Sequence, residues 1–196
     1  MSITPRNISP AIAVLAIALT VAVGLLTGCG TDKGIQMKQM NTSLTEFVTR
    51  EHINTYLLDT LRASPPGMGL SVTPDNPHLS ALGPEIVLNV PCDDNNDDPR
   101  NPVQTQIGYW ITGVPAGQDD HYFELIRNYW TGRGFRLNPD SDSSWAAVRT
   151  PDGYSLALNN ANRGDGSLSI TTGSPCFPKA LEGVTGPQPT ELRRPS

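Results

Sequence analysis

The sequence has few basic residues, and they form no stripe or cluster. Its 196 residues include 14 Lys and Arg against 19 Asp and Glu, a formal net charge of −5. Arg6 is the only charged residue before position 29, so the chain from there onward carries 13 basic and 19 acidic groups, a difference of −6. Without a basic patch, the composition argues against nucleic acid as a partner and against electrostatic docking on anionic lipid.

The short motifs of common enzyme families are also absent. The sequence contains no G-x-S-x-G, S-x-x-K or H-E-x-x-H pattern and no glycine-rich phosphate loop. Its three histidines are His52, His78 and His121. Catalytic groups meet only in space, so a scattered triad stays open, and it would need His78 or His121 beside a carboxylate and a hydroxyl. The sequence therefore predicts a non-catalytic protein without a cofactor, with a hydrolase as the alternative.

An acidic run at residues 91–102, PCDDNNDDPRNP, has part of a calcium-loop pattern. Asp94, Asn96 and Asp98 alternate as the first ligands of an EF-hand do. Pro99 takes the place of the required glycine, and a threonine takes that of the bidentate glutamate. A looser calcium site stays open, a solvated hairpin loop is favoured, and no metal-binding residue is predicted.

Only one long apolar run occurs, at residues 11–26 (AIAVLAIALTVAVGLL). Residues 1–9 before it carry one positive charge and no negative charge. Its sixteen uncharged residues match the hydrophobic region of an export signal and fall short of the roughly 20 needed for a membrane span. Residues 1–28 are therefore predicted to be a signal peptide.

The run ends in Leu26-Thr27-Gly28-Cys29, which resembles the lipobox of bacterial lipoproteins. In that family the cysteine sulfur receives a diacylglycerol, and a peptidase cuts the chain before the cysteine. The resemblance implies cleavage between Gly28 and Cys29, a lipid on Cys29, and attachment to the extracytoplasmic face of the cell membrane. Two or three acyl chains, at about 0.8 kcal/mol per buried CH₂ group, hold a protein on a bilayer. An uncleaved signal anchor with an incidental cysteine is the alternative.

Cysteine is rare, with three residues in the chain. An odd count in an exported protein needs an explanation, and a lipid on Cys29 supplies one. Cys92 and Cys176 are then left to form a disulfide in an oxidising compartment, closing a loop of about 80 residues. Free thiols acting as metal ligands or as a nucleophile are the alternative, although neither cysteine has a C-x-x-C partner.

The chain after the signal peptide is predicted to have three parts. Residues 29–42 form the lipidated N-terminus and a flexible tether, in which the thirteen residues 30–42 span about 20 Å as a coil. Residues 43–176 form one globular domain, a length within the range of single domains. The proline-rich residues 177–196 form a disordered tail.

Two helices are predicted in the globular domain. The first begins at Ser43, whose spacing to Glu46 fits a capping box. The residues expected on its buried side are Leu44, Phe47, Val48, Leu58 and Leu61. The second helix is capped by Asp119 or Asp120 and ends at Gly132 and Gly134. Its apolar face consists of Tyr122, Phe123, Ile126, Tyr129 and Trp130.

Short strands alternate with these helices, and a proline-rich loop is predicted at residues 63–84. The strands are expected at residues 85–90, 104–113, 135–138, 145–150, 154–159 and 167–172, with a hairpin turn at 151–153. The first is mostly apolar and is expected to be buried on both faces. This order predicts an α+β fold, a two-layer sandwich with both helices on one face of an antiparallel sheet.

The aromatic residues gather in the second strand, the second helix and the hairpin. Core packing is the favoured interpretation, and a pocket between helix and sheet for an apolar lipid or glycolipid is the alternative. The residues expected to line that pocket are Tyr109, Trp110, Tyr122, Phe123, Ile126 and Trp130.

Several segments together resemble the small mycobacterial and actinobacterial Lpp lipoproteins. These are the lipobox, an excess of Arg over Lys, and the stretches YFELIRNYWTGRGF, WAAVRTPDGYSLALN and LSITTGSPCFP. The lipobox match covers four residues, and the C-terminal likeness covers about 60 residues. The resemblance implies a domain on the outer leaflet of the cell membrane that faces the cell wall. Because catalytic motifs are absent, the predicted role is non-catalytic, binding an apolar lipid or glycolipid or another envelope protein. The alternative is an envelope hydrolase acting on cell-wall material.

Overall fold

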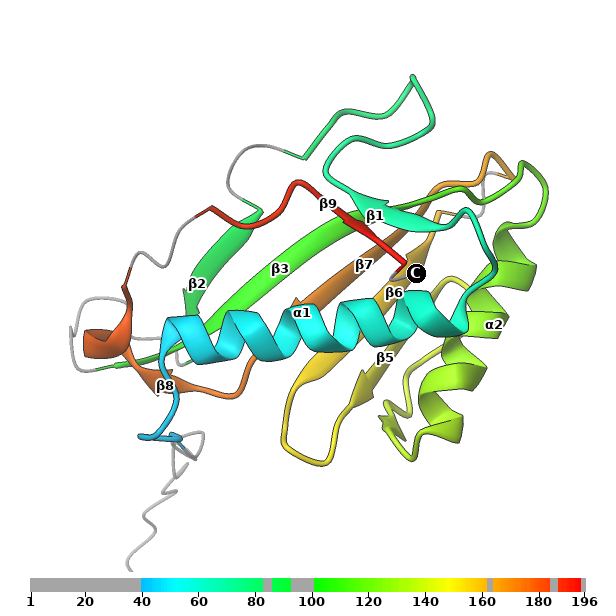
Figure 1. Ribbon diagram of the computed structural model, residues 1–196. Helices are drawn as coiled ribbons and strands as arrows, with labels where there is room; N and C mark the ends of the chain where they lie inside the picture. The colour runs from blue at the N-terminus through cyan, green and yellow to red at the C-terminus, as the bar shows by residue number, and fades with distance from the viewer. Residues whose placement is uncertain (1–39, 83–85, 93–100, 162–163, 184–186, 195–196) are drawn as a thin grey trace, which may run out of the picture. The chain divides into compact units, whose positions relative to one another are not determined.

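The computed structural model describes residues 40–82, 86–92, 101–161, 164–183 and 187–194. Within them, two α-helices, one short 3-10 helix and nine strands follow one another along the chain (Figure 1). Their bounds are α1 Glu46–Ala63, β1 Gly69–Ser71, β2 Val87–Pro91, β3 Pro102–Thr112, α2 Asp119–Gly132, β4 Arg136–Leu137, β5 Trp145–Arg149, β6 Ser155–Asn160, β7 Leu168–Gly173, β8 Phe177–Pro178, η1 Lys179–Leu181 and β9 Glu191–Arg193.

The strands form one sheet, and its described pairings are all antiparallel. The strand order is β4-β5-β6-β7-β3-β1-β9, and β2 and β8 also pair with β3. β3, eleven residues long, is the centre: β7 and β8 pair along one edge, and β1 and β2 along the other. An antiparallel sheet with two helices confirms the predicted α+β class.

The alternation predicted for the second strand is present in β3. Ile107, Tyr109 and Ile111 are buried, and the residues between them are only partly buried. Successive side chains of a strand point to opposite faces, so these three residues face the core while Trp110 points the other way. The predicted hairpin is also present, with β5 and β6 paired on either side of the turn.

Helix α1 begins at Glu46, later than predicted. Thr45 is the N-cap residue, and its Oγ1 accepts a hydrogen bond from the Val48 N–H at 3.3 Å. Ser43 instead donates its N–H and its hydroxyl to Oδ1 of Asn41. The predicted capping box between Ser43 and Glu46 is therefore wrong, because a different side chain satisfies the first turn.

The buried face of α1 also differs from the predicted stripe. Ile53 and Leu57 lie in the core with Leu61, whereas Phe47 is 53% exposed. The same buried face carries the polar residues Glu46, Thr49, Arg50 and Thr60. A hydrophobic pattern misses this face because four of its seven buried residues are polar and find partners inside the fold.

A buried polar network holds the first half of α1 in place. Glu46 Oε2 accepts hydrogen bonds from Asn89 Nδ2 at 3.0 Å and from the Gly183 N–H at 3.1 Å. The Arg50 guanidinium lies 3.5 Å from Glu46 Oε1 and donates to Gln188 Oε1 at 3.3 Å. Charged groups are costly to bury without partners, so these contacts fix α1, β2 and the C-terminal segment relative to one another.

Helix α2 has the predicted amphipathic face. Phe123, Ile126 and Trp130 are buried in the core that is shared with α1 and the sheet. The Trp130 Nε1–H donates to Thr60 Oγ1 at 2.9 Å, which joins the two helices directly. A buried indole N–H usually needs such a partner, so this bond also fixes the ring in the core.

The predicted cap of α2 is wrong. Gln118 occupies the N-cap position and makes no side-chain capping bond. Asp119 Oδ1 accepts from the Gly166 N–H at 2.8 Å, and Asp120 Oδ1 accepts from Asn160 Nδ2 at 2.8 Å. The two carboxylates hold the connection between β6 and β7 against the start of the helix instead.

The prediction of a disordered tail is wrong for the described part of residues 177–196. Phe177–Pro178 forms β8 on β3, and Glu191–Arg193 forms β9 on the edge of β1. Leu192 is buried opposite Leu70. Composition missed these strands because their partners lie far away along the chain, so no local pattern marks them.

The strands on this side of β3 differ from prediction in two further ways. β1 lies in the segment predicted as a loop, because three residues are too few to show a periodicity. β2 is not buried on both faces, and its Leu88 is exposed. The reason is that Leu88 pairs with Gln106 on the outward face of the sheet, where both residues line an open hollow.

The disulfide expected between Cys92 and Cys176 is present. Their Cα atoms are 6.2 Å apart, and the bond joins residues 84 positions apart in the sequence. Cys92 follows β2, and Cys176 directly precedes β8. Because β2 and β8 flank β3 on opposite edges, the bond closes the end of the sheet where β3 begins.

The burial difference in α1 predicts very different losses of stability for two truncations. Leu57 is fully buried at 0% exposure and Phe47 is 53% exposed. Leu57→Ala is expected to lower the free energy of unfolding by about 2–5 kcal/mol, whereas Phe47→Ala changes it by no more than about 0.5 kcal/mol despite removing the larger side chain. Urea denaturation of both variants measures the difference. Equal losses would mean that the buried face of α1 is assigned wrongly.

Candidate functional site

The residues predicted to line an interior pocket do not form one. Tyr109, Phe123 and Trp130 are among the largest fully buried side chains, and Ile126 packs with them in the core. Trp110 points to the opposite face of the sheet. Tyr122, also expected to line the pocket, packs against the core from its partly exposed position on α2. The side chains of Tyr109, Phe123, Ile126 and Trp130 fill the space between helices and sheet, which agrees with the favoured interpretation of core packing and leaves no room there for the alternative of one apolar pocket.

Among the described residues, three surface hollows lie instead on the face of the sheet that carries the outward side chains of β3, and two others lie beside the hairpin turn and between α1 and the C-terminal segment. Along β3 these are Gly108, Trp110 and Thr112, which follow one another at every second position. Thr112 lines a groove of about 340 Å³, and Gly108 lines a hollow of about 240 Å³ with Thr171. Trp110 therefore stands between two concave areas on one face. A third hollow, of about 360 Å³, lies over β4 and β5.

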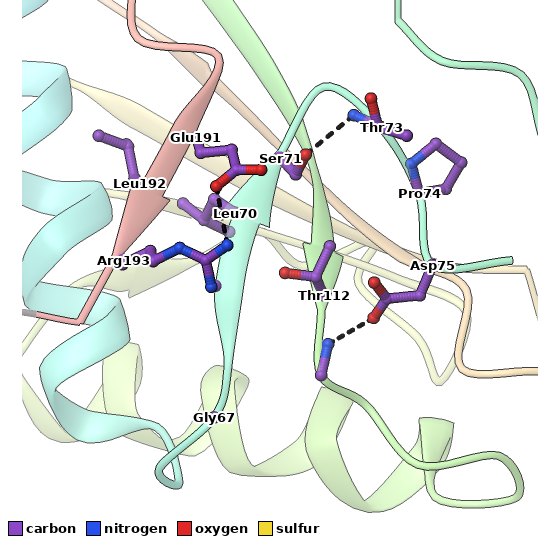
Figure 2. A pocket seen from close by; sticks show the side chains of 12 residues that line it. Gly67, Leu70, Ser71, Thr73, Pro74, Asp75, Thr112, Glu191, Leu192 and Arg193 are labelled. Atoms are coloured by element: carbon purple, nitrogen blue, oxygen red, sulfur yellow. Dashed lines mark hydrogen bonds and ion pairs between the residues drawn. The ribbon is translucent and has the colours of Figure 1, made fainter.

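The groove beside Thr112, here called the β1 groove, is the most polar of these. Its floor comes from β1, β3 and β9, and one wall comes from the loop after β1 (Figure 2). The polar and charged side chains that line it are Ser71, Thr73, Asp75, Thr112, Glu191 and Arg193. Hydroxyl groups that donate and accept thus lie beside carboxylates and one guanidinium.

The charged groups of the β1 groove are already paired with one another or with the backbone. Asp75 Oδ2 accepts from the Gly113 N–H at 2.6 Å, and Arg193 Nη2 lies 2.8 Å from Glu191 Oε2 (Figure 2). None of the described residues that line the groove is a histidine. This arrangement can bind a polar group, but it offers no free base beside a nucleophile.

Two glycines shape the β1 groove. Gly113 has φ +79°, and a Cβ there would collide with the Gly67 carbonyl oxygen. A Cβ on Gly69 would lie 3.0 Å from Thr112 Oγ1 and 3.3 Å from the Leu192 carbonyl oxygen. Larger residues at either position would push β1 away from its neighbours, so the glycines keep the floor of the groove flat.

Titratable groups meet at a different place, where α1 faces the hairpin turn. Asp152 Oδ1 accepts hydrogen bonds from Tyr56 Oη at 2.7 Å and from Thr150 Oγ1 at 2.5 Å. His52 Nδ1 lies 3.6 Å from Asp152 Oδ2. The carboxylate is therefore the hub of the cluster. In a nucleophilic triad the imidazole stands between hydroxyl and carboxylate, so this order does not activate either hydroxyl.

The tyrosines of this cluster have raised pKa values. Burial, followed by the hydrogen bond to Asp152, raises the pKa of Tyr56 from 10.0 to about 12. Burial also raises the pKa of Tyr154, whose hydroxyl is buried and has no hydrogen-bond partner among the described residues. Both effects favour neutral phenols, as expected for rings that pack between the helix and the sheet.

The other two histidines do not join this cluster. His78 lies in an exposed loop, where its N–H donates to Oδ1 of Asn76. His121 is exposed on α2 with its ring against Tyr122. Among the described residues, no group of three His, Cys, Asp or Glu side chains could hold a metal ion. The arrangement required for the hydrolase alternative, His78 or His121 beside a carboxylate and a hydroxyl in one cleft, is not seen in the described part of the chain.

Several predicted features lie outside the described residues. These are the cleavage site at Gly28, the lipidated Cys29 and the acidic positions Asp94, Asn96 and Asp98. In the part of the chain that the structure covers, no helix is long and apolar enough to cross a bilayer. No protein-family model, curated protein or solved structure matches this chain.

Sequence reasoning missed the β1 groove. Its residues come from a three-residue strand, the loop after it and a strand near the C-terminus. The pairing of Ser71 with Trp110 and with Glu191 brings them together, and such long-range register has no local signal. The one local hint was the outward row of β3, in which Gly108, Trp110 and Thr112 alternate with core residues.

The raised pKa of Tyr56 predicts a loss of stability at high pH. The folded chain keeps the phenol proton between the ordinary value of 10.0 and about 12, where the unfolded chain has lost it. The stability contributed by this group is thus complete below pH 10 and falls as the pH rises towards 12. Urea midpoints measured from pH 8 to 12 should fall less steeply for Tyr56→Phe than for the parent chain. Parallel curves would contradict the assignment.

Proposed function

We propose that this chain is a lipid-anchored lipoprotein of the bacterial cell envelope. The observation that supports the anchor is the tetrapeptide Leu26-Thr27-Gly28-Cys29 at the end of the apolar run. After cleavage before Cys29, the lipid on that cysteine would hold the folded domain on the extracytoplasmic face of the cell membrane. The resemblance to small actinobacterial Lpp lipoproteins supports the same location.

The proposed role of the folded domain is binding rather than catalysis. Its interior is filled, so an apolar ligand of the kind first expected has no cavity among Tyr109, Phe123 and Trp130. The β1 groove, about 340 Å³ and lined by hydroxyl and paired charged groups, suits a polar ligand or a polar segment of another envelope protein. The hydrolase is the weaker alternative, because in the cluster around His52 the hydroxyl groups contact the carboxylate of Asp152 and not the imidazole.

A two-layer sandwich belongs to the same proposal. Both helices share one core with the inward side chains of the sheet, including Tyr109, Leu158 and Ile170. The outward side chains at Trp110 and Thr112 lie on the face with the hollows. In this arrangement one face of the sheet is reserved for the core and the other for a partner.

The anchor is tested by removing its cysteine. In an actinobacterial host, Cys29→Ala is expected to leave the signal peptide uncleaved and the chain without the added acyl mass. The membrane fraction should then contain less of the lipid-modified chain. A Cys92→Ala/Cys176→Ala chain is the matched control, since it removes two cysteines and keeps Cys29. Intact-mass spectrometry after detergent extraction measures both. An acylated Cys29→Ala chain, or an unmodified parent chain, would overturn the proposal.

The binding role is tested by filling the β1 groove. Native mass spectrometry of the detergent-extracted full chain is expected to show a non-covalent mass that Thr112→Trp removes, because the indole would occupy the groove. Thr55→Trp, on the exposed side of α1, is the control and should keep that mass. Equal occupancy in both variants, or no bound mass in the parent chain, would count against this site.

A further inference from the structure

Three large apolar side chains are exposed near one end of the described unit. Phe47 on α1 is 53% exposed, Met40 is 40% exposed, and Leu181 at the end of η1 is 37% exposed. Single exposed apolar residues are common on protein surfaces, whereas a group of them indicates a contact surface. Whether these three residues form a contact surface therefore depends on whether they lie close to one another.

Hydrogen bonds bring the segments that carry these residues together. The Gly183 N–H, just after η1, donates to Glu46 Oε2, and Glu46 directly precedes Phe47. The Asn41 N–H, next to Met40, donates to the carbonyl oxygen of Cys176 at 2.8 Å. Figure 1 shows the start of α1, β8 and η1 at the same end of the unit. The three side chains thus share one end.

The chain enters the described unit at this same end. Eleven residues, 30–40, connect Cys29 to Met40 inclusive. As a coil they span about 18 Å, and fully extended they cannot exceed about 38 Å. Resting on the proposed lipid at Cys29, we propose that the end bearing Met40, Phe47 and Leu181 lies against the outer leaflet of the membrane, with these side chains in the lipid interface.

Apolar burial, and not charge, carries this contact. The described residues around η1 carry Lys179 and Glu182, whose charges are of opposite sign. Electrostatics therefore give no attraction to anionic lipid at this end. A neutral phosphatidylcholine bilayer is the appropriate probe, and added salt should leave the contact unchanged.

This orientation places the β1 groove away from the membrane. Helix α1 begins at the apolar end, and its 18 residues correspond to a length of about 27 Å. Gly67, which lines the β1 groove, follows the other end of α1. The groove would therefore open towards the cell wall rather than towards lipid.

The test uses the full-length lipidated chain in phosphatidylcholine vesicles. The vesicles contain a phosphatidylcholine with a photoactivatable diazirine near its glycerol backbone, and labelled peptides are mapped by mass spectrometry. Labelling is expected on the peptides that contain Met40, Phe47 and Leu181. The peptide of Leu137, which is 37% exposed like Leu181 but lies on β4, should stay unlabelled.

Paired variants separate the apolar contact from the anchor. Phe47→Ser/Leu181→Ser is expected to reduce labelling at this end by at least about tenfold, because the loss of even one of the two buried apolar side chains changes the equilibrium by that factor. Leu137→Ser is the control and should leave labelling unchanged. The intact mass shows whether Cys29 carries the lipid. If it does, labelling on other peptides, or unchanged labelling in the double variant, would overturn this orientation and leave the proposed anchor standing. A chain without the lipid mass would overturn the proposed anchor and the orientation with it.

Discussion

The buried carboxylate of Glu46 is the contact on which the arrangement of this fold depends most. One side chain at the start of α1 accepts from Asn89 on β2 and from the backbone of Gly183, and it pairs with Arg50. A buried ion pair loses much of its value if one partner is removed, because the remaining charge is left without compensation. The positions of α1, β2 and the C-terminal segment therefore depend on one another.

The two faces of the sheet have different roles: the inner face packs in the filled core, and the outer face carries hollows. The interior is filled by the side chains of Trp130, Tyr109 and Phe123, which form the core of the domain. A lipid carrier would need that space for its ligand. The same strands present Trp110 and Thr112 on the other face, beside hollows that open to solvent. This division fits the proposed binding role, in which the proposed lipid on Cys29 would attach the chain to the membrane and the outer face of the sheet would meet a polar partner.

Sequence patterns were informative where one face of an element is uniformly apolar. The period of two in β3 and the amphipathic face of α2 predicted both elements, and cysteine counting predicted the pairing of Cys92 with Cys176. The patterns failed where polar groups are buried, since the interior face of α1 contains Glu46 and Arg50. They also failed for β9 and the β1 groove, because each is assembled from segments more than 100 residues apart.

The pairing of β9 with β1 has a consequence for how the chain acquires its fold. Strand β1, near the start of the domain, pairs with β9 in its last residues. Glu46 and Arg50 likewise contact Gly183 and Gln188, which lie far along the chain. Folding dominated by such distant contacts is slow, since loop entropy must be overcome before the contacts form. For the proposed exported chain, β1 would keep an unpaired edge until the segment that forms β9 has also crossed the membrane, so this part of the sheet would be completed last.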